Sequence, residues 1–290
     1  MNMLYLVFGD EQLYYSQSYF SICTFLNQMD ESDRIFVMTD SPDFYKRFED
    51  RIEIILINQD QLIEWKGKHN YLFRTKIKAI QLISELHPDK PLLYLDSDTL
   101  LFADLKLLKE KLNYPVMHIR EGALPELKSK TIKTLWQKIK GRKFGNIAIQ
   151  NSHAMWNAGV VGIPAYKGSH TTNLALNICD EILEENVGKW VVEQLSFSIA
   201  LSENGNLNPV DGFIGHYWSN KDEWNEAIQQ FMLNSFLKNN TVQDDIDAIS
   251  TFDFSKIAIQ KRIPNTQIRL KKLISKWFPS ENKGFIPQKT

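Results

Sequence analysis

The sequence is poor in cysteine and carries almost no net charge. Its 290 residues include two cysteines, Cys23 and Cys179, and neither belongs to a CxxC pair or to a metal-ligand spacing. Disulfide and zinc roles are therefore not expected, and this usage fits a reducing cytoplasm. The formal net charge is −1, so the chain has no general basic field and we expect no nucleic-acid partner.

Long hydrophobic runs are also missing. No apolar run approaches the roughly 18 residues that a membrane-spanning helix needs. The apolar stretch at the start of the chain ends before Asp10 and Glu11. We expect no signal peptide, because this stretch is too short and its flanking residues are of the wrong kind. With 43% hydrophobic residues, the chain can build one large α/β domain or two small ones, and we expect it in the cytoplasm.

The N-terminal third alternates apolar runs with helical patterns. The apolar runs cover 4–10, 34–40, 52–57 and 92–95, and the helical periods cover 14–29 and 71–86. Strands that alternate with helices at this spacing predict βαβ units. We therefore expect an α/β fold with a mostly parallel central sheet flanked by helices over residues 1–225, followed by a C-terminal helical extension over 226–290.

Two carboxylates follow the apolar run 92–95. They belong to Asp96 and Asp98, with Ser97 between them. Open α/β sheets bind ligands at the carboxyl ends of their strands, and two anions this close repel each other unless a cation lies between them. A hard divalent cation fits and leaves positions for substrate phosphates. A turn or a helix cap is the alternative interpretation of such a short motif, but its place after a buried strand favours a metal–diphosphate site.

Three more patterns follow along the chain: Trp156-Asn157-Ala158-Gly159, then Glu193-Gln194, then Gly215-His216-Tyr217-Trp218 with Lys221 just after. Each also has a purely structural interpretation. Asn and Gly are ordinary turn residues. Glu193 could face solvent or pair with Lys189, and His216 could be a histidine bonded to backbone.

In this order, the four patterns resemble the GT-A glycosyltransferases, notably the glycogenin-like and bacterial lipopolysaccharide galactosyl- and glucosyltransferase-like enzymes. The resemblance covers roughly residues 1–225 and implies a Rossmann-like GT-A fold. It implies transfer of a sugar from a nucleoside diphosphate, usually UDP, to a hydroxyl of a glycan or lipid-linked acceptor, as in surface polysaccharide or lipopolysaccharide synthesis. It also implies that Asp96, Asp98 and His216 bind Mn²⁺ (or Mg²⁺), for which carboxylate and imidazole ligands are suitable.

The resemblance also implies roles around the sugar and phosphates. Ser97 and Lys221 would bind the donor, with Lys221 contacting the phosphates, although the Gly and Pro that usually flank this lysine are absent here. Asn157 and Gly159 would form the turn beside the donor sugar, and Gln194 would lie near donor and acceptor. Asp98 and Glu193 are the expected catalytic residues, with Glu193 acting as general base if the reaction inverts the sugar. Whether the configuration is retained or inverted stays open.

Four residues are expected to bind the nucleotide. Phe8 and Asp10 end the first strand and Asp40 ends the second, where an acid could accept hydrogen bonds from uracil or ribose. Arg74 opens the helix before the Asp-x-Asp strand, where GT-A enzymes often place a basic contact to the diphosphate. A surface charge is the more fitting interpretation for Lys76 than for Arg74.

The C-terminal segment 256–277 is basic and amphipathic. It carries seven Lys or Arg and no acid, interleaved with apolar residues, and Pro264 precedes the expected helix. This composition is typical of a helix that lies on an anionic membrane surface. The alternative is a helix packed on the domain with a solvated basic face. We therefore expect either a peripheral protein on the inner face of the membrane or a fully packed tail.

Two other function classes share part of the pattern. A HAD-type phosphatase also ends a buried strand in Asp-x-Asp, but it requires Thr or Val where Leu100 stands, and a later Gly-Asp-x-x-x-Asp is absent from the sequence. A non-catalytic carbohydrate-binding or scaffold protein of the same fold is the second alternative. The intact set Asp96, Asp98 and His216 argues against it.

Overall fold

The computed structural model describes residues 1–185, 187–262 and 264–279. Seven strands form its central sheet: β1 (Asn2–Val7), β2 (Arg34–Thr39), β3 (Glu53–Leu56), β4 (Leu92–Leu95), β6 (Val116–Met117), β11 (Val160–Ile163) and β12 (Asn208–Pro209). Their order is β12-β6-β11-β4-β1-β2-β3. Strands β1 to β4 are parallel, whereas β11 is antiparallel to both β4 and β6. The predicted mostly parallel α/β sheet is confirmed.

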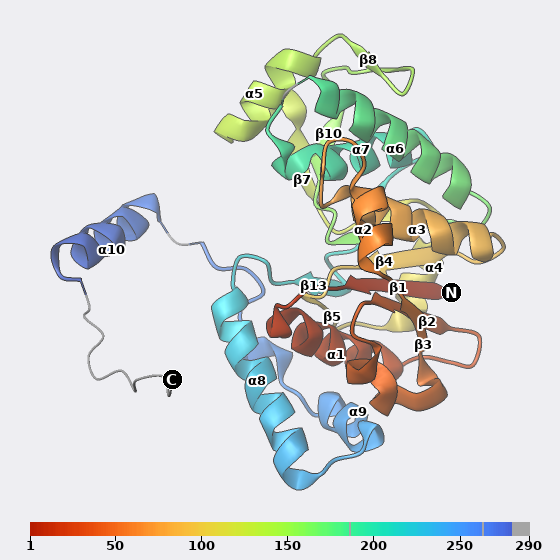
Figure 1. The fold of residues 1–290 in the computed structure, drawn as a ribbon, viewed down its shortest axis with the longest axis vertical. Coiled ribbons are helices and arrows are strands. Elements are labelled where there is room, and N and C mark those ends of the chain that lie inside the picture. The colour runs from red at the N-terminus through yellow and green to blue at the C-terminus, as the bar shows by residue number, and fades with distance from the viewer. Residues whose placement is uncertain (186, 263, 280–290) are drawn as a thin grey trace, which may run out of the picture.

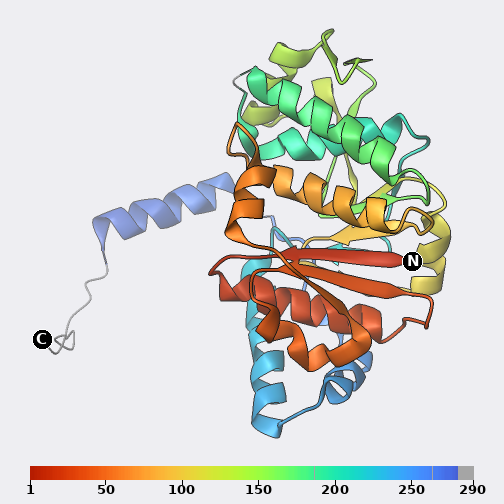
Figure 2. The same cartoon turned by 45° about the vertical axis from the view of Figure 1, so that its right-hand side comes forward.

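Helices cover both faces of this sheet (Figures 1 and 2). One layer contains α2 (Gln59–Lys66), α3 (Arg74–Leu86), α6 (Gly168–Glu184) and α7 (Val192–Ser202), and the other contains α1 (Gln12–Leu26), α8 (Lys221–Lys238) and α9 (Val242–Ser250). Side chains of β1 alternate between the two cores, with Leu4 in one and Met3 and Tyr5 in the other. This period of two is what a strand buried on both faces produces.

Shorter elements complete the fold. They are α4 (Leu105–Lys111), α5 (Lys130–Ile139), the pair β5 (Thr99–Leu101) and β13 (Ile214–His216), the pair β7 (Arg120–Ala123) and β10 (Ala154–Trp156), the hairpin β8 (Lys143–Phe144) and β9 (Ile147–Ala148), and the 3₁₀ turns η1 (Pro42–Arg51), η2 (Leu124–Glu126), η3 (Lys189–Val191) and η4 (Phe254–Lys256). The β5–β13 pair matters most, because it places His216 opposite Thr99 and hence next to the predicted carboxylates.

The predicted boundary between 225 and 226 falls inside α8. Trp224 and Ile228 of α8 are buried in the same core as Tyr19 and Phe20 of α1, and α9 also packs on α1. The first part of the predicted extension is therefore built onto the sheet domain. The division of the chain into two domains stays a prediction.

The tail helix α10 (Asn265–Trp277) begins just after Pro264, as the sequence predicts. It lies apart from both helical layers in the two views (Figures 1 and 2), so the packed alternative is not what the structure shows. Its apolar side chains are exposed, among them Leu270, Leu273 and Trp277. Residues 280–290 of the predicted extension lie outside the described residues. None of the described helices combines the length and apolar character needed to cross a membrane.

Candidate functional site

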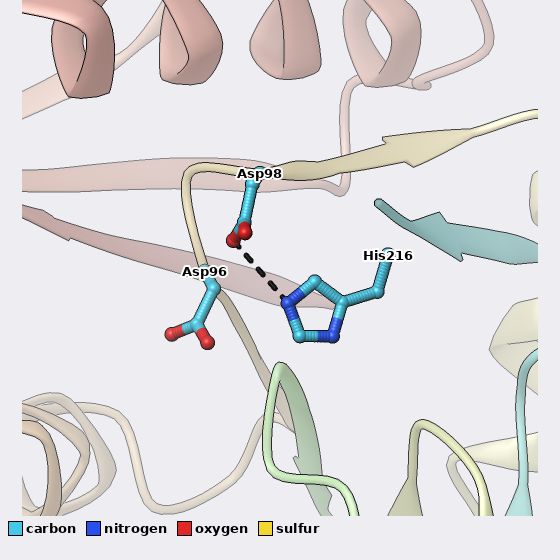
Figure 3. Close-up of side chains that lie close together, drawn as sticks. All are labelled: Asp96, Asp98 and His216. Carbon is cyan, nitrogen blue, oxygen red and sulfur yellow. Dashed lines mark ion pairs between the residues drawn. The ribbon is translucent and has the colours of Figure 1, made fainter. Parts of the chain in front are cut away.

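Three side chains from distant parts of the chain meet at the carboxyl end of β4. Asp96 and Asp98 lie in the turn between β4 and β5, and His216 ends β13 (Figure 3). One ligand atom of each residue lies within 4.8 Å of the others. His216 Nε2 is 3.3 Å from Asp98 Oδ1. Two carboxylate groups and an imidazole that converge in this way fit a divalent cation such as Mn²⁺ or Mg²⁺.

Asp98 is buried and paired on two sides. Besides His216, Lys221 Nζ lies 2.8 Å from Asp98 Oδ2, and the backbone N–H of Tyr217 donates to the Asp98 carbonyl. Burial by itself would raise the pKa of Asp98, but the contacts with His216 and Lys221 outweigh it and hold the pKa well below its usual range. Asp98 is therefore an anion throughout the neutral range.

Asp96 is partly exposed and faces a different set of partners. Tyr94 donates its hydroxyl hydrogen to Asp96 Oδ1 over 3.0 Å, and Lys76 Nζ lies 3.0 Å from the same oxygen. Lys76 also donates to the Ala158 carbonyl at 3.1 Å and forms an ion pair with Glu193 at 3.2 Å. A single buried ammonium group thus links Asp96 to Glu193.

Lys76 and Glu193, which form a buried pair, both have pKa values above their ordinary ones. Burial alone would lower the pKa of Lys76, but Asp96 and Glu193 raise it above its ordinary value, so the lysine stays cationic. For Glu193, burial raises the pKa to about 7; Lys76 opposes this rise and Asp96 adds to it. The ion pair lacks the geometry of a good hydrogen bond, and Glu193 Oε1 has no hydrogen-bond partner among the described residues.

The expectation of a surface charge at Lys76 is wrong, because its side chain is only 9% exposed. A signal was present in the sequence. Lys76 precedes Ile80 and Ile83 by four and seven residues, and all three lie on the buried face of α3. A lysine on the apolar stripe of a helix needs acidic partners in the interior, and here they are Asp96 and Glu193.

A pocket of about 290 Å³ opens beside the two aspartates. Its polar lining includes Lys76, Asp96, Ser97, Asp98 and Lys221. Its apolar lining includes Leu6, Phe8, Tyr14, Leu72 and Phe73. The pocket therefore combines charged groups with aromatic and aliphatic surface, and Lys221 Nζ lies 5.9 Å from the centre of the Tyr14 ring.

The predicted donor-binding residues divide into two groups. Phe8, Ser97 and Lys221 line the pocket, and the Ser97 hydroxyl donates to Gln17 at 3.0 Å. Arg74 does not reach it: its guanidinium forms an ion pair with an aspartate of α6 and donates to a carbonyl of α2, through Asp180 and Trp65.

The two acids at the ends of the first strands are also not among the pocket-lining residues. Asp40 accepts hydrogen bonds from the Gly9 backbone N–H at 3.0 Å and from the Tyr15 hydroxyl at 2.8 Å. It thereby ties the end of β1 to the end of β2. Asp10 is exposed.

Asn157 and Gly159 contact the predicted metal ligands, and Gln194 contacts another carboxylate. Asn157 Oδ1 is 2.8 Å from His216 Nδ1, and the Gly159 carbonyl accepts the Asp96 backbone N–H at 2.9 Å. Gln194 Nε2 donates to Glu121 at 3.2 Å. Asn157 and Gly159 are thus hydrogen-bonded to His216 and Asp96, two of the predicted metal ligands.

Two residues near this network had not been expected. Burial raises the pKa of Glu121, while hydrogen bonds with Gln194 and Asn157 oppose the rise. His118 is buried with its ring 5.3 Å from that of His216, and burial, aided by His216, lowers its pKa to about 4. No local pattern in the sequence distinguishes either residue.

The comparisons with known proteins give structural similarity only. No protein-family model matches the sequence, and no curated protein matches it. Among solved structures, the galactosyltransferase LgtC with donor and acceptor sugar analogues is 16% identical, with 70% of this chain and 71% of that chain covered at a TM-score of 0.47.

Two other similar structures carry glycosyltransferase names. Mouse xyloside xylosyltransferase 1 is 9% identical, with 72% of this chain and 85% of that chain covered at a TM-score of 0.46. The WbbM bifunctional glycosyltransferase is 12% identical, with 72% and 38% covered at a TM-score of 0.48. Because similarity at this level assigns no activity, the functional proposal rests on the geometry of the site.

Proposed function

We propose that the chain is a metal-dependent GT-A glycosyltransferase that moves a sugar from a nucleoside diphosphate donor, UDP-sugar first, to a hydroxyl acceptor. The observation that carries this proposal is the convergence of Asp96, Asp98 and His216 beside a pocket lined by both charged and apolar side chains. A diphosphate matches the cation and the lysines of this lining. A nucleobase and ribose match its aromatic and aliphatic side chains.

Each residue that lines the pocket would have its own role in binding the donor. When bound, the Mn²⁺ or Mg²⁺ ion would neutralise the departing diphosphate. Lys221, at the rim beside Asp98, would contact a phosphate oxygen. Phe8 and Tyr14 would pack against the nucleoside. These preorganised charges would stabilise the leaving group, a contribution that is usually the largest in such a site.

Glu193 is the proposed general base if the reaction inverts the sugar. Its pKa of about 7 suits proton uptake near neutral pH. Its carboxylate is also paired with Lys76 at 3.2 Å, so the same residue fixes the lysine that faces Asp96. In a retaining reaction, Glu193 would only hold Lys76 in place.

The acceptor and the location are finer parts of the proposal. We infer a glycan or lipid-linked acceptor and contact of α10 with the anionic inner face of a membrane. Leu270, Leu273, Ile274 and Trp277 occupy positions i, i+3, i+4 and i+7 of α10, which share one face of a helix, and each is at least half exposed. Arg269, Lys272 and Lys276 lie on the other side of the helix, where they would meet anionic headgroups.

Calorimetric titration of UDP into the purified protein, first with Mn²⁺ and then with EDTA, tests the proposal. We expect binding that requires the metal and is lost in Asp98→Asn. The exposed loop variant Asp89→Asn is the matched control and should bind normally. Hydrolysis of a panel of UDP-sugars then identifies the donor.

Failure to bind UDP with metal present would shift the titration to GDP and CMP. If these also fail to bind, the glycosyltransferase proposal is wrong. A non-catalytic sugar-binding protein or a phosphatase would then take its place, and a saccharide titration and a phosphate-release assay would separate these two.

A further inference from the structure

The side chain of Asn157 is directed to a metal ligand. Its Oδ1 lies 2.8 Å from His216 Nδ1 and also accepts the backbone N–H of Gly159 at 3.0 Å. Both side chains are buried, with Asn157 8% and His216 5% exposed. The family resemblance had assigned this asparagine to the donor sugar, whereas its carbonyl oxygen is already occupied on the metal side.

These two contacts determine which histidine nitrogen carries a proton. The Gly159 N–H can only donate, so the Asn157 atom that faces it is the amide oxygen. An amide oxygen can only accept, so the hydrogen in its contact with His216 must belong to Nδ1. Nε2 is then the nitrogen whose lone pair is available, and it is the one directed toward Asp98 at 3.3 Å.

We propose that Asn157 is a positioning residue that keeps the proton of His216 on Nδ1 and thereby reserves Nε2 for the cation. This inference rests on the metal-dependent function proposed above. Hydrogen bonds behind metal-bound histidines commonly fix the tautomer and the ring orientation, and their loss typically costs about 10- to 100-fold in metal affinity. Here the partner is an uncharged amide, which sets the tautomer without adding a further negative charge to the site.

Gly159 lies against the same ring, at its Nδ1 and Cε1 atoms. A Cβ built at this position would lie 2.2 Å from His216 Nδ1 and Cε1, a distance that forces the ring to move. The backbone here is not in the left-handed region, so the requirement for glycine comes from the close approach of His216. Asn157 and Gly159 therefore act together to fix the orientation of the His216 imidazole.

The tautomer can be read directly in the metal-free protein. Long-range ¹H–¹⁵N correlation spectra of ¹⁵N-labelled protein identify which ring nitrogen is protonated, and His216→Gln assigns the signal. At a pH where the signals stop changing, we expect the Nδ1–H tautomer in the unmodified protein. The Nε2–H tautomer there would overturn the proposal, whatever any variant does.

Variants test the consequence for the cation. Asn157→Leu keeps the size but removes the acceptor, so we expect the tautomer mixture to shift toward Nε2–H and the Kd for Mn²⁺ alone, measured by EPR, to rise about 10- to 100-fold. Asn157→Asp retains an acceptor and should retain the tautomer. Gly159→Ala should weaken Mn²⁺ binding by displacing the ring, and surface Asn113→Leu is the control.

An unchanged tautomer and unchanged Mn²⁺ affinity in Asn157→Leu would contradict the proposal. Thermal unfolding of each variant checks that it is folded. The inference and the proposed function fail in distinguishable ways. Absence of nucleotide binding in the unmodified protein would reject the proposed function. The tautomer of His216 in the metal-free protein would remain an independent test of the role of Asn157.

Discussion

Asp96 and Asp98 lie two residues apart in the chain, yet they belong to two different regions of the molecule. Asp98 is buried between His216 at the end of β13 and Lys221 at the start of α8. Asp96 faces the layer of α3 and α7, where Lys76 links it to Glu193. Both residues lie in the turn between β4 and β5 and not in a strand, so their side chains are free to reach different partners.

The difference between the two sides shows how the site keeps its charges apart. Each aspartate has one lysine, but Lys221 is 41% exposed whereas Lys76 is 9% exposed. Lys221 can change its side-chain conformation when a ligand enters the pocket. The buried one is fixed by three oxygen-bearing partners, so it shapes the site before any ligand arrives.

The largest expected effect is loss of the cation by removing either carboxylate. Asp96→Asn and Asp98→Asn should each weaken Mn²⁺-dependent nucleotide binding by more than ~100-fold, since a ligand matters more than the groups behind it. Isothermal titration measures this. Normal binding by either variant would show that the two sides do not share one ion.

The two lysines should differ in stability. Lys76→Met leaves Asp96 and Glu193 without their buried cation and should lower the free energy of unfolding by about 3 kcal/mol. Lys221→Met removes a partly exposed lysine and leaves the buried Asp98 with His216 as its partner, so it should cost about 1 kcal/mol or less. Urea unfolding of both metal-free variants measures the difference, and equal losses would refute the contrast between the two sides.

The pH dependence should follow Glu193. Its pKa is about 7 in the folded protein against an ordinary 4.5, so between these values the folded state binds more protons than the unfolded chain. Its contribution to stability is present below pH 4.5 and is lost as the pH rises through 7. Glu193→Gln should flatten this slope in metal-free unfolding curves; an unchanged slope would place the titration elsewhere.

The smallest effect should come from the tail, which lies outside both sides of the site. Trp277→Ser should weaken binding to vesicles rich in anionic lipid by about tenfold, because a large ring no longer enters the interface. Phe236→Ser on α8 is the control, because Phe236 is 80% and Trp277 73% exposed. Equal vesicle binding by both variants would argue against a membrane role for α10. Mn²⁺ affinity should not change in either.

The features that could be predicted from the sequence involve residues that lie close together in the chain. The run Leu92–Leu95 and the following Asp96 and Asp98 predict a strand and its ligands within seven residues. The burial of Lys76 needed the register of α3: the resemblance pointed to Arg74 and left Lys76 as a surface charge, whereas Lys76 is the one that lines the pocket.

The connections behind the ligands could not be read locally. Asn157 and His216 are 59 residues apart, and their contact depends on how β13 pairs with β5 and how the turn before β11 is placed. Glu121 lies in the short strand β7 and His118 directly after the short strand β6, and neither has a sequence pattern of its own. Such contacts are set by tertiary packing, which spacing along the chain does not encode.

The most direct test of the central claim is anomalous diffraction from crystals soaked with Mn²⁺ and UDP. The account predicts one strong anomalous peak within coordination distance of Asp96, Asp98 and His216 Nε2, with the nucleotide diphosphate against it. A bound nucleotide without a peak at these residues, or a peak bound to other side chains, would contradict it.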